Sequence, residues 1–571
     1  MENPSDRAQP PILPSSLPRG VLLPVPNGAY AAGVRILIFH GYLLGGTGSN
    51  VYNARLAEAL VALGHEVHLL CQDRRPYEHG FVDAVGTWSE DGLVVQERRE
   101  PRCTVYRPDI GGLLPVYVAD RYEGMDARPF TACSDEEIAR YVEANAAAVR
   151  DVRQRHRFDL ALANHAVMAP LILARALSGS GVPYVVKVHG SALEYTVKAD
   201  PARFVAPARE GLAGARTILV GSRHTARSLW AALEDPELAD RTRAGPPGVD
   251  VHRFGPRSPE AAAAGLAALV ARLSGAVNRV GIADAPDAPD AFARDEREAA
   301  DALGSLEPLH ARLVCFVGKL IVSKGVDLLV AAWPLVLAEV PHARLVIVGF
   351  GAYRQALERL VEVLAEGDLE EARAIARAGR ALEEGAKDAG HRPLGHLLAF
   401  LDGLRDGERE AYTRTASLMG ERVVLTGRLE HSELAELLPA CSAQVVPSTF
   451  PESFGMVAVE AAACGALPVS AAHSGLTEVS DVLADAVPET VRPLLSFPVD
   501  DHAVRALADR LIAWLSADSQ VRAATRTALV DIARERFSWE GVARTVVTAA
   551  SVGPQGLAPL LPAASHPSSV G

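Results

Sequence analysis

The feature that most constrains this fold is an arrangement of apolar runs, glycine-rich turns and helical spacing that occurs twice. Residues 34–39 form a short apolar run, VRILIF, which is followed by the turn GYLLGGTGS, a helical pattern and the apolar run HEVHLLC. The same order returns over residues 311–351, where LVCFV and RLVIV flank a helix. Continuous apolar strands that alternate with helices are typical of a parallel sheet covered on both faces. We therefore predict an α/β protein of two doubly wound, Rossmann-like domains in tandem, with the site in the cleft between them.

Length and composition agree with such a protein. The chain has 571 residues, of which 49% are hydrophobic and 22% charged, as in ordinary globular domains. These values exclude a wholly disordered, collagen-like or coiled-coil chain. The predicted divisions are a disordered tail (1–32), an N-terminal domain (33–245), a C-terminal domain (246–535) with insertions at about 258–308 and 353–420, a C-terminal helix (536–552) and a second disordered tail (553–571).

The charge balance and the N-terminus limit partners and location. A net charge of −13 argues against nucleic acid as the main partner, because neutralising phosphates requires clustered Lys and Arg. The first residues are polar and Pro-rich, unlike a signal peptide, and the sequence holds no apolar run of spanning length. We predict a cytoplasmic enzyme with reduced cysteines, because the six cysteines form no C-x-x-C pair. Membrane association stays open.

A glycine-rich segment, GGTGS, lies between the first predicted strand and its helix. Backbone N–H groups at a helix start can hold an anion, and Gly45 and Gly46 would let a phosphate approach closely. The segment is no dinucleotide fingerprint, since Val51 stands where Gly or Ala belongs, and it lacks the Gly-Lys-Ser/Thr of a P-loop. By itself it fits a plain tight turn equally well.

Two lysines follow the strand LVCFV. Lys319 and Lys324 stand five positions apart in a chain with only five lysines and 52 arginines. Compact ammonium groups at the end of a strand can neutralise a diphosphate as it leaves. The scarcity of lysine favours this hypothesis over a solvated surface pair.

Two glutamates stand eight positions apart in PESFGMVAVEA. Glu452 precedes a predicted helix, and Glu460 lies about two turns into it, so both can face one ligand. Carboxylates accept hydrogen bonds from the hydroxyls of a sugar or a ribose. The alternative is a capping acid and a buried-edge acid, but an unpaired charge at Glu460 in so apolar a run would be costly.

Taken together and in order, these motifs resemble a known family. The segments GGTG, VVKVHG, PPGVDVHRFGP, FVGKLIVSKGVDLL, LTGRLEHSELAELL and FPESFGMVAVEAAACGALPVSA are similar to those of the retaining glycosyltransferases of family 4, which have the GT-B fold. The resemblance covers most of residues 34–550, and the two glutamates in and after PESFG are its most specific part.

The resemblance implies a role for each matching residue. In such enzymes the C-terminal domain holds a nucleotide-diphosphate sugar, and the acceptor sits mostly against the N-terminal domain. Lys319 and Lys324 would contact the diphosphate, and Gly45 and Gly46 would contact it from the other side of the cleft. Glu460 would hold the ribose hydroxyls. Glu452 would lie at the hydroxyls of the donor sugar, beside the backbone of Phe454 and Gly455. His189 would reach the sugar near the reacting carbon, although a lone histidine is more often structural.

The sequence also departs from the family. Lys319 stands where Arg is usual, which keeps the charge but loses the bidentate fork. Pro247 stands where Asn is common, and Ser474 and Gly475 replace a more usual Gly-Gly pair. These departures remove no core catalytic group.

The function we predict is retaining transfer of a sugar from a nucleotide-diphosphate donor to an acceptor hydroxyl. No metal and no cofactor beyond this co-substrate is expected, because the lysines, helix start and glycines can meet the diphosphate charge. The alternatives are a degenerate protein that binds nucleotide sugar or glycan without turnover, a GT-B epimerase, and a disaccharide synthase or phosphorylase. Donor and acceptor stay unidentified, and Arg102, Arg121 and Tyr122 are the residues suggested for the acceptor.

Overall fold

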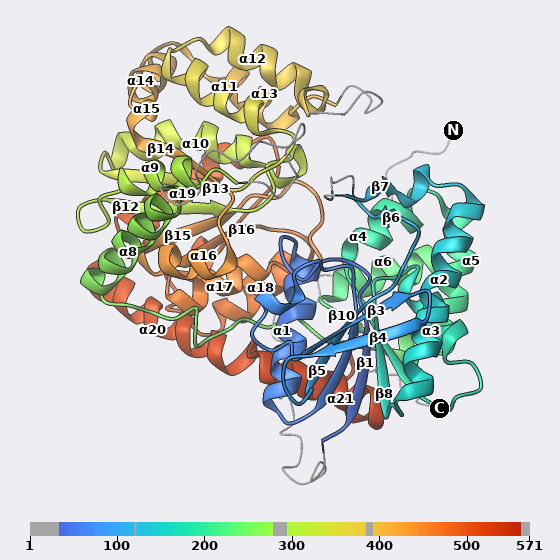
Figure 1. Ribbon diagram of the computed structural model, residues 1–571. Helices are drawn as coiled ribbons and strands as arrows, with labels where there is room; N and C mark the ends of the chain where they lie inside the picture. The colour runs from blue at the N-terminus through green and yellow to red at the C-terminus, as the bar shows by residue number, and fades with distance from the viewer. Residues whose placement is uncertain (1–32, 119–121, 123, 278–293, 384–391, 561–571) are drawn as a thin grey trace, which may run out of the picture.

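The computed structural model describes residues 33–118, 122, 124–277, 294–383 and 392–560. Within these residues the chain forms two α/β halves, each built on a mainly parallel sheet with helices packed against it (Figure 1). The predicted fold class is therefore confirmed. The tail expected at residues 1–32 and the segment 561–571 lie outside the described residues.

The N-terminal half contains, in the described part of the chain, a nine-stranded sheet in the order β11-β10-β9-β8-β1-β2-β5-β3-β4. Its strands are β1 (Arg35–Phe39), β2 (Glu66–Leu70), β3 (Ala84–Ser89), β4 (Gly92–Glu97), β5 (Cys103–Arg107), β8 (Leu160–Asn164), β9 (Tyr184–Val188), β10 (Thr217–Val220) and β11 (Thr242–Ala244). One edge of this sheet is antiparallel, because β4 pairs antiparallel with β3. Residues 90 and 91 form the tight turn of this hairpin, and Gly92, with φ +100°, follows them in a conformation that glycine adopts without strain.

The C-terminal half contains, again among the described residues, a six-stranded sheet in the order β14-β13-β12-β15-β16-β17. Its strands are β12 (Arg312–Val317), β13 (Ala343–Val348), β14 (Val423–Gly427), β15 (Cys441–Val446), β16 (Leu467–Ala471) and β17 (Ser496–Phe497), and neighbouring strands pair in parallel. The runs LVCFV and RLVIV form β12 and β13, so both predicted units exist.

Alternate residues of β1 face the two sides of the N-terminal sheet, as the period of a strand requires. Leu37 and Phe39 pack with α2 (Asp135–Arg155) and α3 (Ala169–Ala176), whereas Ile36 and Ile38 pack with α1 (Gly48–Ala62). Burial on both faces explains why the strand reads as a continuous apolar run. Further helices of this half are α4 (Gly190–Ala192), α5 (Pro201–Ala213), α6 (Arg223–Leu233) and α7 (Glu237–Arg241).

Both insertions are helical where they are described. The first contains α8 (Pro259–Val277) and α9 (Glu296–Gly304), which pack together, and its residues 278–293 lie outside the described part. The second contains α11 (Arg354–Ala365), α12 (Leu369–Ala378), α13 (Gly395–Gly403) and α14 (Asp406–Ala416), grouped at the top of Figure 1. The other helices of the C-terminal half are α10 (Val326–Glu339), α15 (Met419–Arg422), α16 (His431–Leu437), α17 (Met456–Cys464), α18 (Ser474–Ala484), α19 (Ala503–Leu515) and α20 (Ser519–Arg536).

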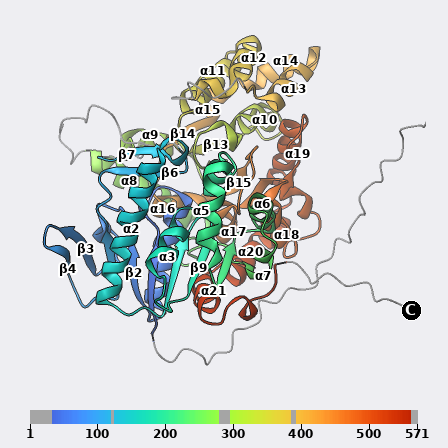
Figure 2. The same cartoon turned by 90° about the vertical axis from the view of Figure 1, so that its right-hand side faces the viewer.

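The last helix returns to the first half. After α20 the chain crosses beside residue 249, where Val249 N–H donates to the Phe537 carbonyl, and forms α21 (Trp539–Ser551). Helix α21 packs on α1, β8 and β9 at the end of the molecule opposite α11–α14 (Figures 1 and 2). The prediction of a disordered tail from residue 553 is wrong for its first residues, because Pro554–Gly556 form a 3-10 turn and Arg243 Nε donates to the Pro554 carbonyl at 2.8 Å.

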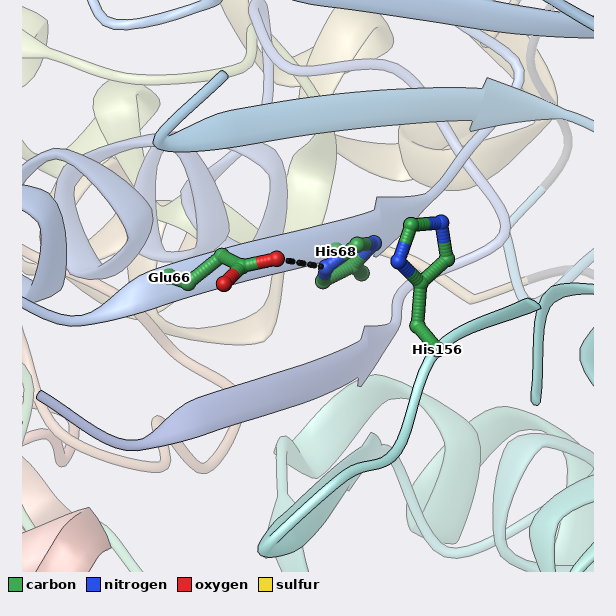
Figure 3. Close-up of side chains that lie close together, drawn as sticks. All are labelled: Glu66, His68 and His156. Carbon is green, nitrogen blue, oxygen red and sulfur yellow. Dashed lines mark hydrogen bonds and ion pairs between the residues drawn. The ribbon is translucent and has the colours of Figure 1, made fainter. Parts of the chain in front are cut away.

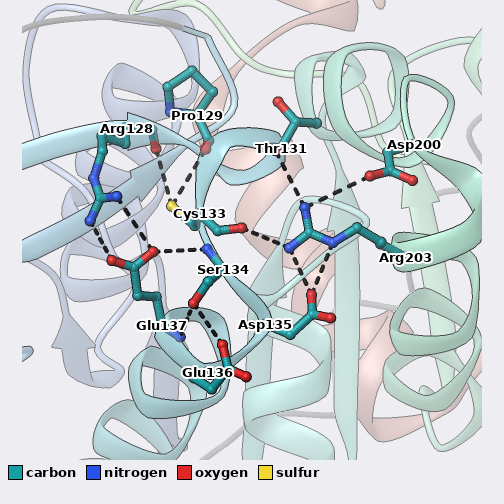
Figure 4. Close-up of polar contacts among 10 residues, drawn as sticks. All are labelled: Arg128, Pro129, Thr131, Cys133, Ser134, Asp135, Glu136, Glu137, Asp200 and Arg203. Atoms are coloured by element: carbon teal, nitrogen blue, oxygen red, sulfur yellow. Dashed lines mark hydrogen bonds and ion pairs between the residues drawn. The ribbon is translucent and has the colours of Figure 1, made fainter.

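A small two-stranded sheet, β6 (Leu113–Val116) and β7 (Asp126–Pro129), lies beside the N-terminal sheet and is fixed to the helices behind it. Ser134 caps α2 in a capping box with Glu137, which also pairs with Arg128 (Figure 4). Arg203 on α5 binds the Asp135 carboxylate at 2.7 Å and the Cys133 carbonyl (Figure 4). Within the described residues, no helix is both long and apolar enough to cross a membrane.

Candidate functional site

A cavity of about 930 Å³ lies between the two halves and is lined by both of them. Its walls come largely from loops that follow strands, which is where parallel sheets place their ligands. All nine residues predicted for the site line it: Gly45, Gly46, His189, Lys319, Lys324, Glu452, Phe454, Gly455 and Glu460. Of the residues suggested for the acceptor, Tyr122 lines the cavity, Arg102 is not among its lining residues, and Arg121 lies outside the described residues.

The glycine-rich segment sits at the start of α1, as predicted. Gly46 has φ +92°, a conformation that glycine adopts without strain. Thr47 is the N-cap of α1 but makes no side-chain capping bond, so backbone N–H groups at this helix start are not satisfied by the cap. The Gly45 carbonyl accepts a hydrogen bond from Asn50 Nδ2 at 2.6 Å, which anchors the segment to its own helix.

Lys324 and Glu452 form an ion pair in the C-terminal wall. Ser448 Oγ donates to the same carboxylate oxygen, Oε1, at 2.6 Å, and the Glu452 backbone N–H donates to Ser474 Oγ at 2.9 Å. Burial alone would raise the pKa of Glu452, but the Lys324 ammonium and the Ser448 hydroxyl outweigh it and hold the pKa below its usual value. Glu452 is therefore a carboxylate at neutral pH. Lys319 lines the same wall.

Glu460 lies on α17 with only 3% of its surface exposed. Its Oε1 is 2.7 Å from Nε2 of His431, the first residue of α16, and the His431 ring packs at 4.7 Å from the Phe254 ring. The buried carboxylate thus has the partner that its apolar sequence surroundings require. Both His431 and Glu460 line the cavity.

Helix α17 begins at a backbone position that requires glycine. Gly455 is the N-cap with φ +116°, and a Cβ there would lie 2.6 Å from Leu476 Cδ2. Phe454 is buried beside it, with its ring 5.8 Å from that of Phe537. This packing fixes the start of α17 between Glu452 and Glu460.

The part of the N-terminal wall around His189 contains neutral polar groups. His189 follows β9, and its Nε2 lies 3.0 Å from Asn164 Oδ1. Burial lowers the pKa of His189 well below its ordinary value, and His165, Lys187 and His40 lower it further. The pKa of Lys187 is itself lowered to about 7 by burial, and its Nζ donates to the Gly245 carbonyl. His189 is therefore uncharged at neutral pH.

Sequence reasoning missed several residues of this cavity. His431, Ser448, His165 and Lys187 all line it. His431 was detectable only through its pairing with Glu460, which is 29 positions away. Lys187 could have been found from the scarcity of lysine, since it is another of the five lysines and lies in VVKVHG.

One group of residues in the described part could hold a metal ion, and it lies outside the cavity. The possible ligand atoms of Glu66, His68 and His156 lie within 4.8 Å of one another, near the start of β2 and the end of α2 (Figure 3). They already have partners within the protein: Glu66 Oε2 binds Arg35 at 2.7 Å, and His68 Nδ1 lies 2.9 Å from Tyr106 Oη.

Known proteins match both halves. Residues 47–238 match a model described as a glycosyl transferase 4-like domain, and residues 311–381 and 403–535 match two models described as glycosyl transferases group 1. The D-inositol 3-phosphate glycosyltransferase of Mycobacterium leprae (strain Br4923) is 31% identical over 250 residues, which are 43% of this chain and 42% of that protein. The chain belongs to the GT4-type glycosyltransferases. The match spans about two fifths of the relative's length.

Solved structures share the GT-B fold of this glycosyltransferase-family chain. Sucrose-phosphate synthase from Thermosynechococcus elongatus has a TM-score of 0.52 at 19% identity, covering 90% of this chain and 98% of that one. The Anabaena protein HepE in complex with UDP has a TM-score of 0.51 at 16% identity, covering 91% and 100%. At such identities the likeness establishes the fold alone.

Proposed function

We propose that this protein is a retaining glycosyltransferase that moves a sugar from a nucleotide-diphosphate sugar to an acceptor hydroxyl. The observation that carries the proposal is the cavity itself, where two lysines and two glutamates on one wall face a glycine-rich helix start and a neutral histidine on the other. The family membership and the UDP bound by the neighbour HepE support it.

The charges fit the needs of the reaction. As the bond between the sugar C1 and the diphosphate oxygen breaks, negative charge grows on the diphosphate, where Lys319, Lys324 and the start of α1 can stabilise it. The acceptor oxygen forms its new bond to C1 on the same face, and its proton passes to the departing phosphate oxygen. A ligand diphosphate would compete with Glu452 for the Lys324 ammonium, which frees the carboxylate for sugar hydroxyls.

The first test needs no acceptor. UDP, GDP and ADP are titrated into the purified protein by calorimetry, and slow hydrolysis of the corresponding glucose conjugates is followed by proton NMR. We expect one nucleotide to bind selectively, and the sugar released first to have the anomeric configuration of the donor.

Two variants sharpen this test. Glu452→Gln should remove turnover while nucleotide binding persists, and Glu370→Gln, at an exposed glutamate of the second insertion, should change neither. Release of the opposite anomer would contradict retention. Binding without any turnover would favour a degenerate binding protein, and solvent deuterium in the recovered nucleotide sugar would favour an epimerase.

A further inference from the structure

A continuous chain of hydrogen bonds runs inside the N-terminal wall from the glycine-rich segment to His189. The four residues between them are each at most 1% exposed. At one end, Asn50 Nδ2 donates to the Gly45 carbonyl at 2.6 Å, and Asn50 Oδ1 lies 3.0 Å from His40 Nε2. On the other side of the His40 ring, Nδ1 lies 3.0 Å from Asn53 Nδ2. Asn53 Oδ1 then accepts from Asn164 Nδ2 at 2.8 Å, and Asn164 Oδ1 lies 3.0 Å from His189 Nε2.

Backbone carbonyls fix which way each amide in this chain points. Asn50 Nδ2 donates to the Gly45 carbonyl, and Asn53 Nδ2 donates to the Ser49 carbonyl at 2.8 Å. Asn164 Nδ2 donates to the Phe39 carbonyl at 3.2 Å. A backbone carbonyl can only accept a hydrogen bond, so the Nδ2 atom of each asparagine must be its NH₂ group. The other terminal atom of each side-chain amide must then be the oxygen.

The fixed amides in turn determine the tautomers of both histidines. His40 Nε2 faces two acceptors, Asn50 Oδ1 and the Leu43 carbonyl, so it carries the hydrogen, and Nδ1 accepts from Asn53. His189 Nε2 faces Asn164 Oδ1 and must donate to it. Because His189 is uncharged, its Nδ1 is left without a hydrogen.

We propose that this chain of asparagines and His40 is a positioning device that holds His189 in the Nε2-protonated form and presents Nδ1 as an acceptor. An unprotonated ring nitrogen accepts a hydrogen bond from a hydroxyl but repels a phosphate oxygen. His189 thereby selects a hydroxyl of a bound sugar, and the diphosphate is left to the opposite wall. Only the identification of that ligand as a sugar rests on the proposed function.

The device also couples His189 to the glycine-rich segment. Asn50 and Asn53 lie on the first turns of α1, next to Gly45 and Gly46, whereas Asn164 ends β8. A phosphate that orders the start of α1 would thus order the amides that hold His189. Asn164 contacts His189 directly, so its substitution should change the protonation of the His189 ring more than substitution of the other residues in this chain of hydrogen bonds.

The test reads the tautomer directly. Protein labelled with ¹⁵N-histidine is examined by long-range proton–nitrogen NMR without ligand, and the His189 signals are assigned through His189→Gln. We expect a proton on Nε2 and none on Nδ1. A proton on Nδ1 in the native protein would overturn the proposal, and the tautomer is read in the native protein without any need for catalytic activity.

Two variants of Asn164 test the mechanism. Asn164→Leu removes the acceptor, so His189 should populate both tautomers, and kcat for UDP-glucose turnover should fall about ten- to a hundred-fold while the UDP affinity is kept. Asn164→Asp keeps the acceptor but adds a charge, so Nε2 should stay protonated and the pKa of His189 should rise.

The matched control is Asn145→Leu, at a buried asparagine of α2 that donates to the Tyr141 carbonyl in the same helix. It should leave the His189 signals and kcat unchanged. An unaltered His189 tautomer in Asn164→Leu, or an equal loss of kcat in both leucine variants, would refute the positioning role. If no nucleotide sugar is turned over by the native protein, the proposed transferase function fails while the tautomer measurement still decides this inference.

Discussion

Around Glu452, in the C-terminal wall of the cleft, polar side chains meet as opposite charges, whereas around His189, in the N-terminal wall, they meet as neutral amides and imidazoles. Lys324 pairs with Glu452, and Ser448 completes the carboxylate's hydrogen bonds. Across the cavity, His40 and His189 are uncharged because burial lowers the pKa of each. The difference separates two tasks, since mobile ammonium groups suit a diphosphate and oriented neutral acceptors suit hydroxyls.

The largest effect is expected from removing a charge on the C-terminal wall. Lys324→Ala should lower turnover of the nucleotide sugar by about 10²- to 10³-fold, because a group that stabilises the leaving diphosphate is lost. Steady-state kinetics and calorimetry with UDP would measure it. Arg359→Ala, which removes an exposed cation of α11, is the control and should be silent. Unchanged turnover in Lys324→Ala would assign the diphosphate to another part of the cavity.

A smaller effect is expected at the buried glutamate. Glu460→Gln keeps an oxygen that can accept from His431 Nε2, so the fold should persist. The loss of the carboxylate should weaken UDP binding by about ten- to a hundred-fold, as for hydrogen bonds to charged groups. Binding of the nucleoside diphosphate is measured beside thermal unfolding. Normal affinity with lowered stability would make Glu460 structural only.

Acid should distinguish the two halves. The pKa values of His40 and His68 in the N-terminal half are lowered to about 4 by burial, so the unfolded chain takes up protons first and stability falls as the pH drops from about 6.5 towards 4. In the C-terminal half, burial raises the pKa of Asp327 to about 7, so the folded state takes up a proton and gains stability over the same window. Glu452 loses its contribution only below about 4.5.

Hydrogen exchange at pH 7 and pH 5.5, corrected for the intrinsic rates, measures this difference. Exchange protection in β1 and β8 should fall at the lower pH, while β12 and β15 keep theirs. The double variant His40→Gln/His68→Gln removes two of the histidines whose pKa values are lowered by burial and should reduce the response of the N-terminal half. Equal loss of protection in both halves would show that the charge pattern does not decide their acid stability.

The smallest effect is expected where the walls touch. Glu478 on α18 accepts the backbone N–H groups of Arg223 and His224 at the start of α6, both at 3.0 Å. Glu478→Ala should loosen this contact, raise KM for the nucleotide sugar a few-fold and leave kcat nearly unchanged, because hydrogen bonds of this kind are worth about 1 to 3 kcal/mol. Small-angle scattering would report a wider separation of the halves. A fall in kcat instead would place Glu478 in the chemistry.

Much of the architecture could be predicted because it is encoded locally. The runs that became β1, β2, β12 and β13 are apolar apart from one or two residues each, and a strand buried on both faces requires that pattern. The hairpin of β3 and β4 escaped prediction because its strands lie at a sheet edge and mix exposed with buried residues. The packing of α21 on the first half was also not predicted, because the amphipathic spacing of a helix shows that one face is buried but not which surface that face packs against.

The sequence by itself determined the two halves, the scarcity of lysine and the spacing of Glu452, before a helix, and Glu460, within it, because each depends on residue type and short-range periodicity. Only the tertiary structure decided which groups meet. His431 contacts Glu460, Lys324 pairs with Glu452, and Asn164 contacts His189. In each contact, strand ends and helix starts that are distant in the chain bring the two side chains together. The protonation state of each of these side chains depends on those contacts, because burial and hydrogen-bond partners set its pKa and the composition of the chain does not.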